Sequence, residues 1–252
     1  GKISGYLGIA VDITERKRLD RMKNEFIATV SHELRTPLTS IAGALGLITQ
    51  GATGELPPKA AKMADVAYRN TQHLSALVND LLDMEKLVSG KVRISTRRED
   101  IVPIIHETVE NHGTFADQRG VALETRGPGH AIVANVDPKR LKQALSNLLS
   151  NAIKFSPCGG NVLIDFREDE GGVAIRVHDQ GAGIPEEYQD QIFQRFAQVN
   201  KSDNRQQPGT GLGLAITREL MHAMGGEVGF ESEEGQGACF WLSLPIKQPA
   251  AE

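Results

Sequence analysis

The segment Ser31–Leu38, with the sequence Ser-His-Glu-Leu-Arg-Thr-Pro-Leu, places a nucleophile, a carboxylate and a hydroxyl at fixed offsets on an expected helix. A neutral histidine has a ring nitrogen whose lone pair can attack phosphorus. Because the ordinary pKa of a histidine is ~6.5, its side chain is largely neutral at cytoplasmic pH. Glu33 can take or orient the proton of the other ring nitrogen. Pro37, one turn after His32, is expected to bend the helix. A lone His-Glu pair is more often plain helix surface, so this interpretation depends on the rest of the chain.

A second set of polar residues lies on the helix expected over 138–155. Asn147, Asn151 and Lys154 are separated by four and three residues, so they share one face of that helix. Amide oxygens are hard ligands that suit Mg²⁺, and an ammonium group can neutralise a phosphate beside it. Taken alone, a helix of this kind more often presents a solvated polar face.

Two glycine-containing turns follow. The segment 179–185 (Asp-Gln-Gly-Ala-Gly-Ile-Pro) comes after an expected strand, where a carboxylate can accept a hydrogen bond from the exocyclic amine of adenine. The segment 209–214 (Gly-Thr-Gly-Leu-Gly-Leu) precedes a helix expected over 215–224, whose N-terminus can hold phosphates. The second segment matches neither the dinucleotide fingerprint nor the P-loop, so a different nucleotide-binding fold is indicated.

The elements that carry the histidine form a predicted helical hairpin over residues 14 to 89. Apolar residues recur at spacings of three and four through 19–48 and 63–87, and glycines and prolines interrupt them at 51–58. Charged residues between the apolar positions at the start are typical of a coiled coil. Because a hairpin cannot bury both apolar stripes alone, pairing with a second copy into a four-helix bundle is predicted. Packing against the same chain's other domain is the alternative.

After residue 90 the pattern changes to alternating strands and helices. Helices are expected over 101–116, over 138–155 and from 211, and strands near 121–124, 132–136, 162–167 and 173–179, before a terminal hairpin turning at 233–237. This order implies a mixed sheet under a helical layer. The polar run at 201–207 is expected to be a loop. The chain is therefore predicted to be multidomain, with an α part followed by an α+β part.

Composition narrows the function classes. A chain of 252 residues that is 40% hydrophobic can form one large or two modest domains, and a net charge of −4 argues against binding nucleic acid. The two cysteines, Cys158 and Cys239, lack metal-ligand spacing and fit a reducing compartment such as the cytoplasm. No run approaches the roughly 18 apolar residues of a membrane span. The start at Gly1 suggests an excised fragment, and membrane attachment of the parent protein is left open.

These motifs resemble a known family. Segment 31–38 resembles the phosphoacceptor box of bacterial sensor histidine kinases, and the segments around Asn147, Asp179 and Gly209 look like their nucleotide boxes. Ile192–Phe196 resembles the family's phenylalanine box, and 225–237 its last glycine box. The resemblance covers about residues 14 to 245, with four motifs in the family's order. Residues 8–17 are similar to the end of a PAS sensor domain and its exit helix.

The resemblance implies a fold and a division into domains. A helical hairpin would form a dimeric four-helix bundle, followed by an α/β sandwich of the histidine kinase ATPase type. Residues 1–12 would be the last strand of a truncated PAS-like domain, 13–24 a coiled-coil signalling helix and 25–90 the dimerisation and histidine phosphotransfer domain. Residues 91–248 would be the catalytic ATP-binding domain, with a tail at 249–252.

The resemblance also implies roles for individual residues. His32 would be phosphorylated by ATP, Glu33 would act as general base, and Thr36 would orient the water of a phosphatase reaction. Asn147 and Asn151 would hold Mg²⁺, Lys154 would contact phosphate and Asp179 would bind adenine. The rest of the nucleotide site would comprise Phe155, Gly181, Gly183, Ile184, Gly209, Thr210, Gly211, Leu212, Gly213 and Leu214.

Three further features of the nucleotide site follow from the resemblance. The segment 197–208 would be the ATP lid, tied to the core by Phe193 and Phe196. Arg195 would face either the transferred phosphate or solvent. Ala238 departs from the family, which often has a hydroxyl residue there, and is expected to weaken nucleotide binding without abolishing it.

The implied partners are a second copy of the chain, the receiver domain of a response regulator whose aspartate takes the phosphoryl group, and an upstream sensor domain. Two other functions would use part of the same motifs. An ATPase of the gyrase, mismatch-repair and chaperone superfamily would share the asparagine and glycine boxes but lacks the hairpin with His32. A dimeric scaffold would bind nucleotide without transferring phosphate. The stimulus, the identity of the regulator and the choice between cis and trans phosphorylation stay open.

Overall fold

The computed structural model describes residues 12, 14–52, 54, 56–89, 94–169, 172–198 and 210–245. The chain divides into two compact units, Gly1–Glu85 and Lys86–Glu252. The strand predicted before residue 12, and with it the PAS-like stub, lies outside the described residues, as do Gly209 and most of the predicted lid. No helix of the described ranges is both long and apolar enough to cross a bilayer.

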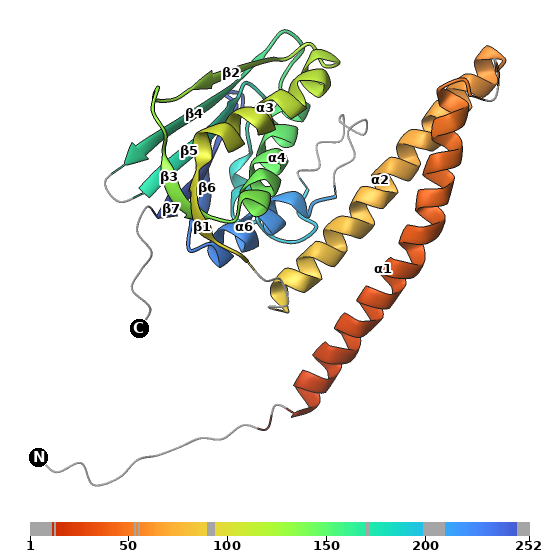
Figure 1. Ribbon diagram of the computed structural model, residues 1–252, viewed down its shortest axis with the longest axis horizontal. Helices are drawn as coiled ribbons and strands as arrows, with labels where there is room; N and C mark the ends of the chain where they lie inside the picture. Colours follow the sequence, from red (N-terminus) through yellow and green to blue (C-terminus); the bar gives the residue numbers. More distant parts are fainter. Residues whose placement is uncertain are drawn as a thin grey trace, which may run out of the picture. The chain divides into compact units, whose positions relative to one another are not determined.

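The first unit is a helical hairpin, as predicted (Figure 1). Helix α1 spans Thr14–Thr49 and runs without interruption through Pro37, and helix α2 spans Pro58–Val88. Gly51 ends α1 in the left-handed conformation, with φ of 77°, and its N–H donates to the Ile48 carbonyl. The Ala52 N–H donates to the Leu47 carbonyl at 3.0 Å, which completes a Schellman turn that only glycine enters without strain.

The hairpin buries only part of its apolar surface within one chain. Leu38, Val78 and Leu82 are 5 to 8% exposed. Other large apolar side chains are 37 to 74% exposed: Met22, Val30, Leu34, Ile41 and Leu47 on α1, and Met63, Val66 and Leu74 on α2. Soluble helices seldom leave this much apolar surface in water without a partner.

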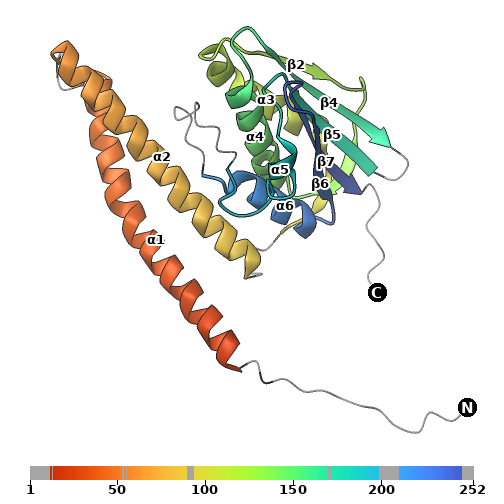
Figure 2. The same cartoon turned by 180° about the vertical axis from the view of Figure 1, so that it is seen from behind.

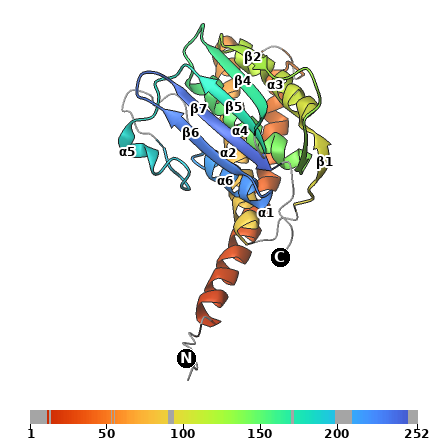
Figure 3. The same cartoon turned by 90° about the vertical axis from the view of Figure 1, so that its left-hand side faces the viewer.

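The second unit is a mixed sheet with helices on one face (Figures 2 and 3). Its elements are β1 Arg97–Asp100, α3 Ile101–Asp117, β2 Ala122–Arg126, β3 Val133–Val136, α4 Pro138–Phe155, β4 Asn161–Asp169, β5 Gly172–Asp179, α5 Glu186–Gln189, α6 Gly213–Ala223, β6 Glu227–Ser232 and β7 Ala238–Pro245. The sheet order is β2-β4-β5-β7-β6; β2 and β4 are parallel and the other neighbours antiparallel. Strands β1 and β3 form a separate antiparallel pair.

The core lies between this sheet and its helices. Buried and half-buried residues alternate along β4 and β5, because successive side chains of a strand point to opposite faces. The inward set includes Val162, Ile164, Val173, Ile175, Val177, Leu242 and Leu244. Helix α4 covers it with Leu141, Leu145, Leu148, Leu149 and Ile153, none more than 1% exposed. The opposite face of α4 is thereby fixed as its polar face.

The predicted elements of this unit are confirmed with small shifts. The helix at 138–155 has the expected bounds, and the last helix begins at Gly213, between the expected starts at 211 and 215. Strand β1 was not predicted, since its sequence Arg-Arg-Glu-Asp is entirely charged. The ladder with β3 and the hydrogen bond from Ile101 N–H to the Ile132 carbonyl hold it in place.

Candidate functional site

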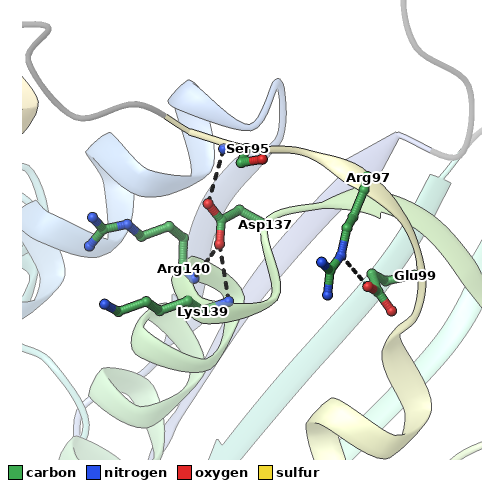
Figure 4. A network of polar contacts seen from close by, with 6 residues as sticks. All are labelled: Ser95, Arg97, Glu99, Asp137, Lys139 and Arg140. Atoms are coloured by element: carbon green, nitrogen blue, oxygen red, sulfur yellow. Dashed lines mark hydrogen bonds and ion pairs between the residues drawn. The ribbon is translucent and has the colours of Figure 1, made fainter.

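Helix α4 is held firmly at its first turn (Figure 4). Asp137 is its N-cap, and Oδ1 accepts from the backbone N–H groups of Lys139 at 3.1 Å and Arg140 at 3.3 Å. Oδ2 accepts from the backbone N–H of Ser95 at 3.1 Å. Figure 4 also shows the neighbouring pair of Arg97 and Glu99 on β1. A carboxylate suits the positive end of a helix, so Asp137 both starts α4 and fastens the segment that precedes β1.

The polar face of α4 carries two asparagines in different states. The Nδ2 group of Asn147 donates to the Gly213 carbonyl at 3.0 Å and to the Thr217 hydroxyl at 3.2 Å, which joins α4 to α6. Asn151, one turn later and half-buried, makes no side-chain hydrogen bond within the described residues. A half-buried amide without a protein partner is suited to bind something other than protein.

Lys154 lies half-buried at the end of the same face. Its Nζ is 4.9 Å from the centroid of the Phe155 ring, and it forms no ion pair within the described part of the chain. Burial lowers the pKa of Lys154, and the charge of Arg119 lowers it further. The Arg119 Nη1 also donates to the Lys154 carbonyl at 3.4 Å. An ammonium group that lacks a carboxylate partner favours an anion beside it.

Asp179 ends β5 beside the last turn of α4. Its Oδ1 accepts from the N–H groups of Gly181 at 2.8 Å and Ala238 at 3.2 Å, while Oδ2 has no partner among the described residues. Burial raises the pKa of Asp179, and the two backbone donors and His178 act in the opposite direction. The carboxylate is therefore held in place through one oxygen and offers the other as a hydrogen-bond acceptor.

The glycines after Asp179 let three segments meet closely. A Cβ on Gly181 would lie 2.8 Å from the Phe155 carbonyl oxygen, and one on Gly183 would lie 2.1 Å from that of Glu233. Gly183 also has φ of 68°, which favours glycine. The N–H of Ile184 donates to the Ser232 hydroxyl at 2.9 Å. The turn is thus pressed between the end of α4 and the β6–β7 turn, where no side chain would fit.

The second glycine segment leads into α6. Thr210 Oγ1 accepts from the Leu212 N–H at 3.1 Å, and Leu214 lies in the first turn of the helix. No side chain caps this N-terminus, so its N–H groups point outward without a side-chain acceptor. Gly211 has φ of 67°, and its carbonyl accepts from the Phe196 N–H at 2.8 Å. This bond joins the residues on either side of the segment 197–208 that is predicted to be the lid.

The phenylalanine box contributes one packed and one exposed ring. Phe193 contacts Phe230 with ring centroids 6.0 Å apart, and Phe230 stacks on Phe240 at 5.8 Å. Phe196 is 62% exposed with φ of 62°, so it is tied to the core through its backbone. Arg195 between them is exposed.

The predicted phosphoacceptor segment lies in α1. His32, Glu33 and Thr36 are all within the helix, and the side chains of Glu33 and Thr36 are exposed. Pro37 has no N–H, so the Glu33 carbonyl one turn earlier lacks its helical donor. Arg35, in the same segment, binds the Asn79 amide oxygen on α2, with Nη2 at 2.8 Å and Nε at 3.2 Å.

The second unit thus gathers, from α4, β5 and the start of α6, the groups that a nucleotide requires. Amide oxygens suit a hard cation, an ammonium and an uncapped helix N-terminus suit phosphates, and a carboxylate suits an amino group on a base. The structure joins Asn147 to the second glycine segment, and Phe155 to the first.

Sequence reasoning missed Thr217, Arg119 and Asn79. The only available signals were a threonine in an apolar helix face, an arginine before a glycine turn and an asparagine in a leucine-rich helix.

Two family models match the two units. Residues 22–90 match the His Kinase A (phospho-acceptor) domain, and residues 136–248 match the histidine kinase-, DNA gyrase B-, and HSP90-like ATPase domain. The chain is similar to the sensor histidine kinase WalK of Bacillus subtilis, with 36% identity over 250 residues that cover 98% of this chain and 41% of WalK. It is also 37% identical over 225 residues to the circadian input-output histidine kinase CikA of Synechococcus elongatus, covering 88% of this chain and 30% of CikA.

A solved structure shares the fold of both units. Full-length ShkA, in a complex with AMPPNP, aligns with a TM-score of 0.72 at 33% identity, covering 90% of this chain and 47% of ShkA. The chain spans less than half the length of WalK, CikA and ShkA. The order of a helical phosphoacceptor domain and an ATPase domain is the same as that predicted from the sequence. The chain belongs to the sensor histidine kinase family and contains that family's phosphoacceptor domain and ATPase domain.

Proposed function

We propose that this chain is the catalytic core of a sensor histidine kinase that uses ATP to phosphorylate His32 and passes the phosphoryl group to an aspartate of a response regulator. The observation that carries this is the set of unsatisfied polar groups on α4 and β5. In the described part of the second unit, Asn151 and Asp179 each hold a hydrogen-bonding atom without a protein partner, and Lys154 holds a charge without a carboxylate partner. We assign the phosphotransfer domain to residues 25–90 and the ATP-binding domain to 91–248.

The groups gathered in the second unit fit ATP. Asp179 Oδ2 is the acceptor for the adenine amino group. Gly181 and Gly183 allow the turn after Asp179 to pack directly against backbone, which holds this carboxylate in place. Phe155, 53% exposed and next to Lys154, offers a ring face to the base. The uncapped N-terminus of α6, entered through Thr210–Gly213, is the donor set for the phosphates, and Lys154 supplies a positive charge beside them. Gly209, Ile184, Leu212 and Leu214 complete the proposed nucleotide site.

The same face of α4 fits Mg²⁺. Asn151 offers an amide oxygen without a partner, and Asn147 turns its NH2 group toward α6, so its Oδ1 is directed away from that helix. Bound there, Mg²⁺ would neutralise charge on the phosphate oxygens, which is the principal need of phosphoryl transfer. The residues of this chain then need only hold the phosphates in the orientation that the transfer requires.

At His32 the proposed step is in-line transfer of the γ-phosphoryl group. A ring nitrogen of His32 forms a bond to phosphorus as the bond from phosphorus to the ADP oxygen breaks, and the proton on the other nitrogen passes toward Glu33. Arg195 is a candidate for charge stabilisation of the transferred group. The resulting phosphohistidine would donate its phosphoryl group to the aspartate of a regulator. Thr36 would orient water for the opposing activity, hydrolysis of the phosphorylated regulator.

The partners we propose follow from the hairpin. A second copy would cover the exposed apolar stripe on α1 and α2, giving a four-helix bundle. The receiver domain of a regulator would dock on that bundle beside His32. The helix before residue 25 would connect the bundle to an upstream sensor domain, and the core would act in the cytoplasm, where ATP is available.

The test is autophosphorylation with ATP labelled on the γ-phosphate in the presence of Mg²⁺. The wild type is expected to acquire label that is labile in acid and stable in alkali, and His32→Ala to acquire none. The matched control is His73→Ala, on α2 of the same hairpin, which is expected to retain the label. Label that persists in His32→Ala would contradict the assignment of the phosphoacceptor. Nucleotide binding without any label would instead favour the non-catalytic scaffold.

A further inference from the structure

A buried threonine on α6 stands behind the first asparagine of the proposed nucleotide site. Thr217 is completely buried, and its hydroxyl donates to the Gly213 carbonyl one turn earlier at 2.9 Å. The same hydroxyl accepts from Asn147 Nδ2 at 3.2 Å, and that Nδ2 also donates to the Gly213 carbonyl at 3.0 Å. Three groups on two helices thus form a closed ring of hydrogen bonds.

The directions of these bonds fix the orientation of the Asn147 amide. The Gly213 carbonyl can only accept, and the hydroxyl hydrogen of Thr217 is already committed to that carbonyl. Both partners therefore present lone pairs to Asn147, which must turn its NH2 group inward. A flipped amide would bring its carbonyl oxygen against two acceptors. Asn147 Oδ1 is consequently directed away from α6, where no described residue binds it.

A purely structural role for Thr217 explains its hydrogen bond to the Gly213 carbonyl but not the one it accepts from Asn147. A threonine in a helix often satisfies itself by donating to the carbonyl four residues earlier, as the Thr108 hydroxyl does with the Ile104 carbonyl on α3. Thr108, 2% exposed, has no side-chain partner in the described chain. Thr217 has the same bond and in addition receives Asn147. Its buried neighbours on α6 are mainly apolar, and valine would fill the same volume.

We propose that Thr217 is a positioning residue of the nucleotide site, which holds the Asn147 amide so that its oxygen faces Mg²⁺ and its associated phosphate. This inference rests on the proposed function. Without the Thr217 hydroxyl, one Asn147 hydrogen loses its acceptor in a place that water does not reach, and the amide can rotate to seek another. Partners that orient ligand residues in this way generally contribute tenfold or more to metal affinity.

The test uses the full 252-residue chain and compares Thr217→Val with Thr217→Ser and Thr108→Val. Binding of AMPPNP is titrated at a series of Mg²⁺ concentrations and again with EDTA. For Thr217→Val, the Mg²⁺ concentration at half-saturation is expected to rise by about tenfold, while affinity without Mg²⁺ changes less than about twofold. Thr217→Ser, which keeps the hydroxyl, is expected to restore the wild-type value, and Thr108→Val to retain it.

A second readout needs no ligand. The side-chain amide of Asn147, identified by its disappearance in Asn147→Asp, is followed by nuclear magnetic resonance in the nucleotide-free protein. We expect its hydrogens to exchange with solvent faster in Thr217→Val and at the wild-type rate in Thr108→Val. Equal Mg²⁺ dependence and equal exchange in wild type and Thr217→Val would overturn the inference. If the wild type binds no nucleotide, the proposed function fails, and unchanged amide exchange in Thr217→Val would separately overturn the role of Thr217.

Discussion

Arg35 on α1 and Asn79 on α2 are joined by two hydrogen bonds to a single atom. The Nη2 and Nε groups of Arg35 donate to the Asn79 Oδ1 at 2.8 Å and 3.2 Å. Arg35 lies three residues after His32, so the two residues share a face of α1. This pair fixes the register of the two helices at the turn that carries the proposed phosphoacceptor, which the leucine pattern of α2 did not reveal.

Replacement of Asn79 by alanine is expected to loosen the hairpin at this turn. Because both hydrogen bonds from an exposed guanidinium are lost, the free energy of unfolding should fall by about 1 kcal/mol, and autophosphorylation should slow. The control is Asn70→Ala, since the exposed Asn70 amide donates to the Val66 carbonyl of its own helix. Thermal unfolding followed by circular dichroism compares the two variants. Equal midpoints would show that the pair contributes nothing to the hairpin.

Thr36→Ala is expected to leave autophosphorylation unchanged and to reduce dephosphorylation of the partner regulator, because Thr36 is proposed to orient the attacking water. Loss of one such hydrogen bond generally costs about tenfold in rate. Thr39→Ala is the matched control, since Thr39 is also exposed on α1 and its hydroxyl donates to the Arg35 carbonyl of the same helix. Release of phosphate from purified phosphorylated regulator measures the effect. Unchanged release in Thr36→Ala would remove Thr36 from the mechanism.

The half-buried carboxylate of Asp179 is expected to lower the stability of the fold at neutral pH, although the proposed nucleotide site requires it. Burial raises the pKa of its carboxyl above the ordinary value of 3.8, so between that value and the folded-state pKa the native protein binds more protons than the unfolded chain. The stability contributed by protonated Asp179 is thus lost as pH rises through this window. Asp179→Asn is therefore expected to unfold at a higher temperature than wild type at neutral pH, with a smaller difference in acid, where both carry a neutral group.

The same variant is expected to lose nucleotide affinity by about tenfold to a hundredfold. The amide oxygen would stay on the two backbone N–H donors, so the NH2 group, which cannot accept, would meet the adenine amino group. Calorimetric titration with AMPPNP and unfolding scans at several pH values measure both effects. Weaker binding together with lower stability at neutral pH would indicate that the substitution disrupts the fold, which would contradict this account.

The sequence was sufficient for the elements whose periodicity is strong. The helix predicted over 138–155 has its observed bounds, and its buried apolar face and the Asp137 N-cap explain why. Strand β1 escaped prediction because all four of its side chains are charged, and only its pairing with β3 makes it a strand. Tertiary contacts of this kind override local propensity.

The sequence predicted which residues of α4 lie on its polar face, but not which of them hydrogen-bond to other parts of the protein. The spacing of Asn147, Asn151 and Lys154 put them on one face, as observed. It did not distinguish Asn147, whose amide is bound to α6, from Asn151, whose amide has no partner among the described residues. That difference depends on which helix packs beside α4, and α6 begins 62 residues after Asn151 at Gly213. A local sequence pattern cannot predict which helix, so far away in the sequence, packs beside α4.

Ala238→Thr is expected to strengthen nucleotide binding. Ala238 pairs with Asp179 across β7 and β5, and its N–H donates to Asp179 Oδ1 at 3.2 Å, so a hydroxyl added at its Cβ lies beside the carboxylate. One additional hydrogen bond, direct or through water, is worth about a fivefold gain. Cys239→Ser is the control, because side chains of successive residues in β7 point to opposite faces. Equal or weaker binding of AMPPNP by Ala238→Thr would contradict the proposed adenine position.

The exposed stripe of the hairpin predicts how the chain assembles. Leu74 on α2 is 46% exposed and follows Met63 and Val66 along the same side of the helix, where a second copy would cover it. Leu74→Glu places a charge in that proposed interface, and desolvating an unpaired carboxylate costs several kcal/mol, so the variant should be a monomer. Gln72→Glu, exposed on a different side of α2, adds the same charge and should remain a dimer. Light scattering after size-exclusion chromatography measures the mass of each. A wild-type monomer, or a dimer that tolerates Leu74→Glu, would mean that the stripe is covered in another way, and the bundle proposed here would have to be abandoned.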